Sequence, residues 1–533
     1  MTCSHIIRDI KADHVVAQLI VLPNSMNDQN NYTLRPPWFN YILHSSVMVL
    51  RLLMPTYLTR EASHFGKKNL KDMKILTKLL SFCLALVLFV TTLMPSAAMA
   101  SPSIDPETQQ IFILSILSNA ASGVDSSKLV GETLEDLLKK RVTDFLKKDS
   151  IIQAIGTWDV VWGPVVHQIK GSKYATNSMY VAKKDNQYVV AIAGTNPSSL
   201  FDWFPEDFSV KKQVDWQNGD IPKCRVKFRD ETDKPKISKG TCIGLKKLEE
   251  MKSSDQTVLD FLGDEVKSAG EPTENIEIIF AGHSLGGALS PTLALAALDQ
   301  QSKWCGSCEE KDFKILVYPS AGPTPGNKYF ANYYDSRLGE NTTRIWNDID
   351  IVPHAWDEDM LDKIPGLYKW DILPGMAVRA LVEIAKDLAG NGEYTQLVVA
   401  QENHNLELQG NVNTDLLHCQ KEEVSQVIEE LEDKILKDPE LQRGLYLSND
   451  IENTSSLTQE EQKQYLENFV YGLKPFMKQA GYQHTTEYAV LLDVEEPYSE
   501  MFEMFQDNPG EQCSYNLAQL ETLVLKLLKE QPQ

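Results

Sequence analysis

Positive charge is scarce in this chain of 533 residues. It carries 52 Lys and Arg residues against 74 Asp and Glu residues, which gives a net charge of −22. The imbalance is uneven, because residues 1–100 carry +5 and the remaining residues carry −27. A body with so much negative charge repels phosphate backbones, so the composition argues against nucleic-acid binding. In other respects the amino-acid composition, with 42% hydrophobic and 24% charged residues, is typical of a globular protein.

The N-terminal region lacks an apolar run of the ~20 residues that a membrane-spanning helix needs. The run Leu79–Met94 has only 16 residues, two lysines precede it, and the small-x-small sequence Ala98-Met99-Ala100 follows it. This layout predicts a secretory signal peptide over residues 73–100, cleaved between Ala100 and Ser101. The predicted location is therefore secreted or periplasmic. The alternative is a membrane anchor formed by an uncleaved 79–94.

Residues 1–72 have little acid and no persistent hydrophobic periodicity. A signal peptide acts at an N-terminus, so a leader in front of it is unexpected. We therefore hypothesise that Met73 is the true start and that residues 1–72 come from a mis-assigned start. The alternative is a genuine, poorly ordered extension.

Cysteine is also sparse, with six residues after position 100: Cys224, Cys242, Cys305, Cys308, Cys419 and Cys513. Export permits disulfides, but sequence alone does not choose among their pairings. Cys305 and Cys308 form a C-x-x-C pair without a second such pair or a His pair, so a local disulfide is favoured over a zinc or redox site. Neither a metal nor an organic cofactor is expected.

Hydrophobic patterns alternate between strand and helix over residues 151–355. Strands are predicted at 177–184, 187–195, 275–284, 312–322 and 342–352, with helices at 242–254, 256–270 and 286–301. This alternation predicts an α/β fold with a mainly parallel sheet flanked by helices. Two helices are predicted within residues 101–150.

The remainder is expected to be mostly helical. Helices are predicted at 376–390, 421–438, 457–481 and near the C-terminus at 517–531, and residues 394–410 could form a hairpin. A capping box of Thr458 and Glu461 marks the start of one helix.

The sequence GHSLGG at 282–287 places Ser284 between a predicted strand and a predicted helix. A sharp strand-to-helix turn lifts a serine above the sheet and aims the next backbone N–H inward. Backbones approach closely in such a turn, and Gly282, Gly286 and Gly287 supply the small residues that it needs. This context identifies Ser284 as a candidate nucleophile.

With its neighbours, this segment resembles the class 3 lipases, the fungal-lipase-like branch of the α/β-hydrolase fold. The similar blocks are VVAIAGTNPSSLFDWFPEDF, IIFAGHSLGGALSPTLAL, VYPSAGPTPGNKYFANYYDSRL, TRIWNDIDIVPHAW and AGYQHTTEYAVLL. They occur in the family's order and cover about residues 155–355 and 480–495. The resemblance implies an exported, bacterial serine esterase of this family.

The resemblance places the catalytic acid at Asp350, before Ile-Val-Pro, with Asp348 as the local rival. It places the base at His484 in GYQHTTEY, where Glu487 and Tyr488 follow. The order Ser, Asp, His along the chain matches this fold. Among the other histidines, His404 and His418 lack these flanks.

Two oxyanion donors are implied by the same resemblance. One is the N–H of Leu285, and the other is Thr195 in AGTNPSS. His283 and His354 lie inside the nucleophile and acid motifs, and we interpret them as supporting residues.

The chain departs from the family in two places. The interval where a lid is expected, about 209–240, is very polar, which argues against interfacial activation through that segment. The 134 residues between Asp350 and His484 imply an inserted subdomain at 356–478. Either it is a cap that lines an acyl-chain pocket, or its apolar residues are an ordinary core, the interpretation that we favour. Those residues are Trp356, Met360, Leu361, Ile364, Leu367, Tyr368, Trp370, Ile372 and Leu373.

The sequence therefore predicts a hydrolase core at 151–355, preceded by helices at 101–150 and completed by 479–533. The predicted activity is lipase-like hydrolysis of acyl esters through an acyl-enzyme, on a lipid or small ester, with transient contact at a lipid interface. A phospholipase on the same scaffold and a non-catalytic binding protein are the alternatives.

Overall fold

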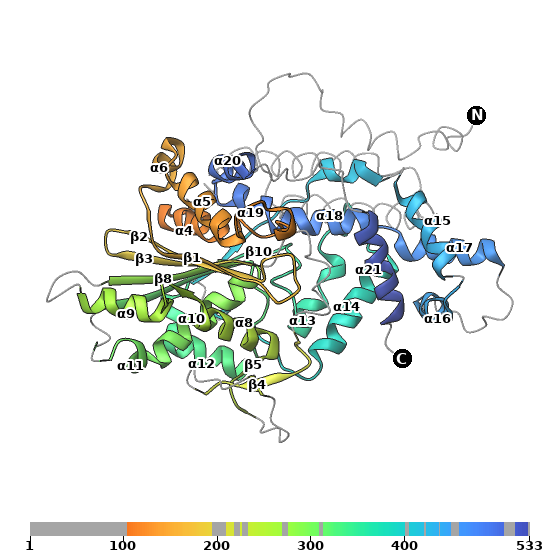
Figure 1. Ribbon diagram of the computed structural model, residues 1–533. Helices are drawn as coiled ribbons and strands as arrows, with labels where there is room; N and C mark the ends of the chain where they lie inside the picture. The colour runs from red at the N-terminus through yellow and green to blue at the C-terminus, as the bar shows by residue number, and fades with distance from the viewer. Residues whose placement is uncertain are drawn as a thin grey trace, which may run out of the picture. The chain divides into compact units, whose positions relative to one another are not determined.

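The core of the structure is a seven-stranded sheet whose strands follow runs of Val, Ile and Ala in the sequence (Figure 1). Its order is β1–β2–β3–β8–β9–β10–β11, and every pairing from β3 to β11 is parallel. The computed structural model describes residues 104–194, 209–217, 224–225, 233–268, 276–306, 308, 313–399, 404–420, 423–435, 437–448, 458–505 and 517–530. The strands are β1 Asp159–His167, β2 Asn177–Lys184, β3 Gln187–Ile192, β8 Ile276–His283, β9 Phe313–Ser320, β10 Arg344–Asn347 and β11 Asn405–Leu408.

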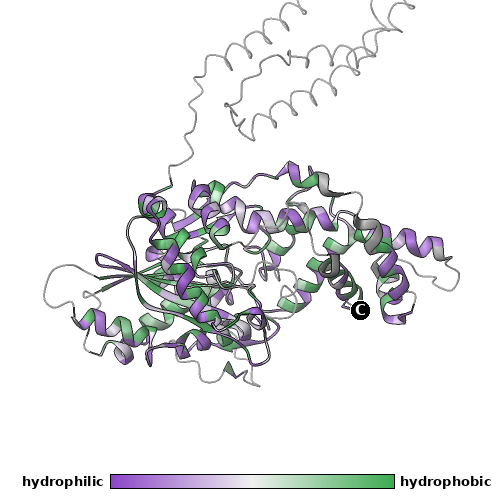
Figure 2. Ribbon diagram, turned by 45° about the horizontal axis from the view of Figure 1, so that its top comes forward, coloured by the Kyte–Doolittle hydropathy of each residue, from purple (hydrophilic) through white to green (hydrophobic). Residues whose placement is uncertain are grey.

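Helices cover both faces of this sheet, as a parallel sheet buried on both sides requires. The layers are visible in Figure 1, and Figure 2 shows apolar residues concentrated where helices meet the sheet. One face carries α4 Pro106–Leu117, α5 Leu134–Leu146, α6 Asp149–Ile155 and α20 Glu495–Phe505. The other carries α8 Lys239–Glu250, α9 Val258–Ser268, α10 Leu285–Asp299, α11 Gln301–Trp304 and α12 Lys328–Leu338. The two faces bury separate apolar clusters, so the predicted α/β-hydrolase architecture is confirmed.

A third apolar cluster lies among the helices of the C-terminal half. These helices are α13 Glu358–Leu361, α14 Met376–Ala389, α15 Glu423–Ile435, α16 Pro439–Ser448, α17 Gln459–Val470, α18 Leu473–His484 and α21 Leu517–Lys529. Helix α19 Thr486–Leu491 packs instead in the cluster on the face that carries α4. Of the apolar residues weighed as cap or core, five are buried in this cluster: Trp356, Leu361, Ile364, Tyr368 and Ile372. Trp370 and Leu373 are exposed. This burial agrees with the core interpretation.

Three sequence predictions need correction. Residues 394–410 do not form a hairpin; their last part is β11, which pairs in parallel with β10. The predicted helix 457–481 is two helices, because Gly472 has a φ of 73° and ends the helical path between α17 and α18. Strand β1 was missed, since its Gly163-Pro164 pair interrupts the apolar pattern; as an edge strand β1 tolerates proline.

Other local predictions are confirmed. The capping box of Thr458 and Glu461 opens α17. Cys305 and Cys308 form the expected local disulfide. A second disulfide, which the sequence did not choose, joins Cys224 to Cys242 in α8 and thereby ties the polar segment before α8 to the hydrolase core. The side chains of Cys419 and Cys513, like the whole predicted signal region, lie outside the described part of the chain.

Candidate active site

Ser284 stands in the tight turn between β8 and α10. Its φ of 61° lies in the left-handed region, which a residue other than glycine occupies only when its surroundings hold it there. The backbone supplies part of that hold, because Ser284 N–H donates to Ser320 O at 3.0 Å and Gly287 N–H donates to Ser284 O at 2.8 Å. The turn therefore presents the serine hydroxyl beyond the carboxyl end of β8.

The three glycines predicted for this turn lie where no side chain fits. A Cβ at Gly282 would come within 2.3 Å of Gly286 O, and a Cβ at Gly286 within 2.3 Å of Ile192 O. A Cβ at Gly287 would come within 2.3 Å of Ser320 O. All three contacts are with backbone atoms, so the turn closes only with glycine at these positions.

The structure brings Ser284, His484 and Asp350 together. His484 Nε2 lies 2.8 Å from Ser284 Oγ, and His484 Nδ1 lies 2.8 Å from Asp350 Oδ2. A carboxylate only accepts, so Nδ1 carries the proton and Nε2 is left to accept the serine hydroxyl. All three side chains are at least 95% buried. The arrangement is a continuous hydrogen-bonded series from hydroxyl to carboxylate.

The rival residues lie elsewhere. Asp348 Oδ1 accepts the N–H of Gly410 at 2.8 Å and makes a loop contact. His404 precedes β11, at the amino end of that parallel strand, whereas Ser284 lies at the carboxyl ends. The side chain of His418 lies outside the described residues.

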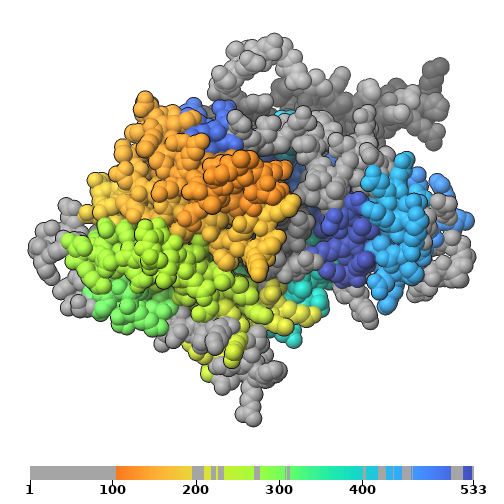
Figure 3. Space-filling model, viewed as in Figure 1, coloured from red at the N-terminus to blue at the C-terminus, as the bar shows by residue number. Residues whose placement is uncertain are grey.

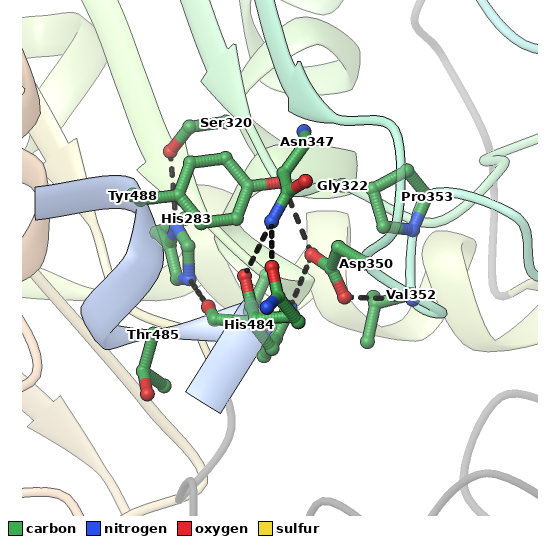
Figure 4. A network of polar contacts seen from close by, with 12 residues as sticks. His283, Ser320, Gly322, Asn347, Asp350, Val352, Pro353, His484, Thr485 and Tyr488 are labelled. Carbon is green, nitrogen blue, oxygen red and sulfur yellow. Dashed lines mark hydrogen bonds and ion pairs between the residues drawn. The ribbon is translucent and has the colours of Figure 1, made fainter. Parts of the chain in front are cut away.

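Asp350 is held by two further donors (Figure 4). Val352 N–H donates to Oδ1 at 3.0 Å, and the Tyr488 hydroxyl donates to Oδ2 at 3.0 Å. Tyr488 accepts in turn from the N–H of Asn347 at 2.9 Å. Burial and the nearby Asp350 charge raise the pKa of Tyr488 well above its usual range, so it remains a donor. In the sequence, Tyr488 stands out only as a flank of the histidine motif, and this role was not predicted.

His283 supports the base through its backbone. Its Nε2 lies 2.7 Å from the carbonyl oxygen of His484, and its Nδ1 lies 3.1 Å from Ser320 Oγ. A carbonyl only accepts, so Nε2 carries the proton. Burial, and after it the charge of His484, lowers the pKa of His283 well below 6.5, which keeps the ring neutral. Figure 4 shows His283 between these two partners, the position expected of a supporting residue.

His354 lies in the loop that follows β10, residues 348–356, here called the acid loop. Its Nδ1–H donates to the backbone oxygen of Asp350 at 2.7 Å, and its ring meets Trp346 edge to face. Burial lowers the pKa of His354 to about 4. Like His283, it is neutral at pH 7 and fixes the backbone of a neighbouring site residue.

Two buried glutamines hold the end of α18, from which His484 projects. Gln483 Nε2 donates to Asn411 O at 2.6 Å, and Gln479 donates to Asn413 O. Asn347 Nδ2 donates to Gln483 Oε1 at 2.7 Å. These contacts fix α18 against the loop that follows β11. They went unnoticed in the sequence, where glutamines on a helix normally indicate a solvated face.

Of the two expected oxyanion donors, Leu285 lies among the described residues and Thr195 does not. Leu285 is the first residue of α10 and packs half-buried against two apolar clusters. Thr195 lies outside the described residues. Its neighbour Gly194 is described, and a Cβ there would lie 3.0 Å from Ser284 Cβ and 3.5 Å from Leu285 N. The chain entering Thr195 thus runs directly against the nucleophile turn.

A serine, a histidine and an aspartate in series at the carboxyl edge of a parallel sheet define a serine hydrolase of the α/β-hydrolase class. Residues 189–360 match the profile of the family Lipase (class 3). The chain is similar to that family over these residues, and the protein is a lipase-like serine ester hydrolase that acts on lipid or ester substrates.

Several solved structures are similar to this chain. The crystal structure of M37 lipase is 27% identical, covers 75% of this chain and 95% of its own, and superimposes with a TM-score of 0.52. A Rhizomucor miehei lipase in complex with its propeptide is 18% identical, with 46% and 62% of the two chains covered and a TM-score of 0.31. Lipase II from Rhizopus niveus is also 18% identical, with 48% and 76% covered and a TM-score of 0.29.

Two features are absent from the described residues. No group of three or more His, Cys, Asp and Glu side chains there is arranged to hold a metal ion. Over the same residues, no helix combines the length and apolarity needed to cross a bilayer.

Proposed function

We propose that Ser284 is the nucleophile, His484 the general base and acid, and Asp350 the group that orients the histidine. Serine is a weak nucleophile at neutral pH and needs a base within hydrogen-bond reach. The observation that carries the proposal is the series of two 2.8 Å contacts linking Ser284 Oγ to the Asp350 carboxylate through His484.

Proton movement follows from the tautomer. His484 Nε2 takes the hydroxyl proton as Ser284 Oγ bonds to the ester carbonyl carbon, and Asp350 stabilises the imidazolium that forms. His484 then gives this proton to the leaving alkoxide as the ester bond breaks. Water repeats the sequence on the acyl-enzyme, which releases the carboxylic acid and restores the serine. Tyr488 and Val352 keep the carboxylate aimed at Nδ1 throughout.

The developing oxyanion needs donors that are already in place. We assign this role to the N–H of Leu285 and to Thr195. Support comes from the position of Leu285 at the start of α10 and from the closeness of Gly194 to the serine. Thr195→Ala is expected to lower kcat by ~100- to 1000-fold, the usual effect of removing one oxyanion donor.

Labelling with a fluorophosphonate tests the nucleophile directly. We expect covalent labelling of the unchanged protein and none of Ser284→Ala or His484→Ala. A circular dichroism spectrum and a melting temperature close to those of the unchanged protein must accompany each loss. Labelling that persists in Ser284→Ala would contradict the assignment, and an unlabelled parent protein would favour a non-catalytic binding role.

A panel of ester substrates can identify the class of ester that the protein hydrolyses. We propose an acyl ester of a lipid, with triacylglycerol and phospholipid as the two candidate headgroup classes. Short p-nitrophenyl esters, triglyceride emulsion and phospholipid vesicles are to be compared at equal enzyme concentration. A preference for vesicles over emulsion would identify a phospholipase, and activity on short esters alone would refute lipid specificity.

We also propose that the protein is exported. The support is the basic, apolar and small-x-small order over residues 73–100. Intact mass of the native protein tests both this proposal and the status of residues 1–72. A mature chain beginning at Ser101 is expected, and a chain that retains residues 79–94 would indicate an anchor.

A further inference from the structure

Three large apolar side chains are exposed on two contacting segments, residues 125–131 and 168–176, which together are here called the turn surface. Val130 is 96% exposed, Ile169 57% and Tyr174 43%. Scattered single apolar residues on a surface need no explanation, but a group on two touching segments does.

The two segments form one hydrogen-bonded unit. Ser126 N–H donates to Lys173 O at 2.8 Å, and Gln168 Nε2 donates to Ser126 Oγ at 2.9 Å. Lys173 Nζ lies 3.6 Å from Asp125 Oδ2. Within the turn, Gln168 also donates to Ser172 O at 2.6 Å. The exposed side chains therefore lie on two segments that hydrogen bonds and an ion pair hold together.

The turn surface lies on the catalytic edge of the sheet. His167 at the end of β1 pairs with Asn177, and Met179 of β2 pairs with Ile192 of β3. Ile192 pairs with Gly282, two residues before the nucleophile. With ~4.8 Å between strands, the turn begins about 10–15 Å across the sheet from the nucleophile strand.

Figures 1 and 3 show the part of the molecule to which these segments belong. In Figure 1 the turn after β1 leaves the end of the sheet on which β10 and α18 lie. In Figure 3 the orange and gold segments of the N-terminal part form a continuous portion of the viewed face.

The charge of the turn surface is opposite to that of the whole protein. It carries Lys128, Lys170 and Lys173 against one acid, Asp125, in a chain with a net charge of −22. The nearest acids along the chain are Glu132 and Glu135, and Glu135 accepts the backbone N–H of Val166. Exposed apolar side chains on the same segments as lysines suit an anionic lipid–water interface, where the apolar tips enter the acyl boundary and the ammonium groups meet phosphates.

We propose that the turn surface docks this hydrolase on anionic phospholipid surfaces and brings the catalytic edge to the lipid. The benefit of docking rests on the proposed function, because it would bring the catalytic edge to its substrate. Docking itself can be measured without hydrolysis. The turn surface would also contact lipid independently of the polar interval at about 209–240, where a lid is expected.

Hydrogen exchange read by mass spectrometry tests the docking on the full chain. Ser284→Ala is used so that the vesicles stay intact, with vesicles of phosphatidylcholine and phosphatidylglycerol as the probe. Peptides covering 125–131 and 168–176 are expected to exchange at least threefold more slowly with vesicles. The peptide covering 394–399 is the internal control, because it also carries an exposed valine, Val399, and the backbone N–H of Val398 donates to the Asp335 carboxylate in α12. Unchanged exchange in both turn-surface peptides overturns the proposal and leaves a protein partner as the alternative occupant.

Variants give the second readout. The triple change Val130→Ser, Ile169→Ser and Tyr174→Ser is expected to lower hydrolysis of anionic vesicles at least tenfold, with hydrolysis of soluble p-nitrophenyl butyrate within twofold of the parent. Val399→Ser, a matched exposed valine, is expected to change neither. Equal vesicle hydrolysis by the triple variant and the parent overturns docking. Loss of soluble ester hydrolysis by the parent itself contradicts the proposed function instead, and leaves the exchange result standing.

Discussion

Replacing Tyr488 with phenylalanine tests how the acid is held. The change removes one hydroxyl and keeps the ring, which stacks on Phe112 at 6.2 Å and meets His283 edge to face. That hydroxyl makes two buried contacts, one to the Asp350 carboxylate and one from the Asn347 N–H. The two contacts have separate consequences, so activity and stability are expected to change for different reasons.

The magnitudes follow from the type of each bond. A hydrogen bond to a charged group contributes ~1.5–3 kcal/mol. If most of that serves to orient Asp350 for the imidazolium, kcat/KM falls by about 10- to 100-fold. The N–H of Asn347 is left buried without its acceptor, which lowers the free energy of unfolding by ~1–3 kcal/mol.

The assay compares kcat/KM on a soluble ester with the urea midpoint of unfolding. Tyr334→Phe is the matched control, since that buried hydroxyl bonds to Thr342 Oγ1 at 2.7 Å far from the acid loop. The control is expected to lose similar stability and no more than twofold in kcat/KM. If Tyr488→Phe keeps kcat/KM within twofold, or if Tyr334→Phe loses as much, the positioning argument is refuted.

Further changes probe the acid, the turn and the buried histidines. Asp350→Asn is expected to lower kcat by ~10⁴-fold and Asp348→Asn by no more than a few-fold on the same soluble ester; equal losses would mean that the acid is misassigned. Gly286→Ala forces a Cβ to 2.3 Å from Ile192 O, so the urea midpoint should report a loss of at least ~2 kcal/mol, and a smaller loss would show that the turn can relax. With a folded-state pKa of about 4 against 6.5 unfolded, His354 takes its proton first in the unfolded state as pH falls. This residue should lower stability by ~3 kcal/mol from pH 6.5 to 4, and His354→Asn, which keeps the donor but does not titrate, should remove that part of the slope while the part from His283 remains.

The nucleophile turn was predictable because its causes are local. The strand predicted at 275–284 is β8 at Ile276–His283, and the following helix begins within one residue of its prediction. An unbroken apolar run fixes a buried strand, and three glycines permit the close approach that the turn requires. No distant residue has to be known for either inference.

The support of the acid and base was not predictable, because each contact joins segments far apart in the chain. Tyr488 reaches Asn347 across 141 residues, and Gln483 reaches Asn411 across 72. A tyrosine four residues after a histidine, or a glutamine before it, has no local signature of such a bond. The backbone group that each side chain contacts depends on the tertiary structure. The sequence therefore predicts the candidate site residues but not the contacts that hold them.

The long interval between Asp350 and His484 is more than an insertion placed beside the core. Its β11 pairs with β10 over Arg344–Asn347, and the loop beyond β11 receives the glutamines of α18. The helix that delivers His484 is therefore positioned by the same segment that extends the sheet. From the sequence, this interval is predicted to be separate from the core, because its helical pattern differs from the alternation of strands and helices before it. In the folded chain, removal of β11 and its loop would release the base. Residues 358–389 contact the acid loop through the Tyr368 hydroxyl, which donates to Ile349 O at 2.9 Å, and through the apolar cluster that they share with Ile351 and Val352. The part of the interval that could be varied for substrate preference is thus its first helices, and the part that the chemistry cannot lose begins at β11.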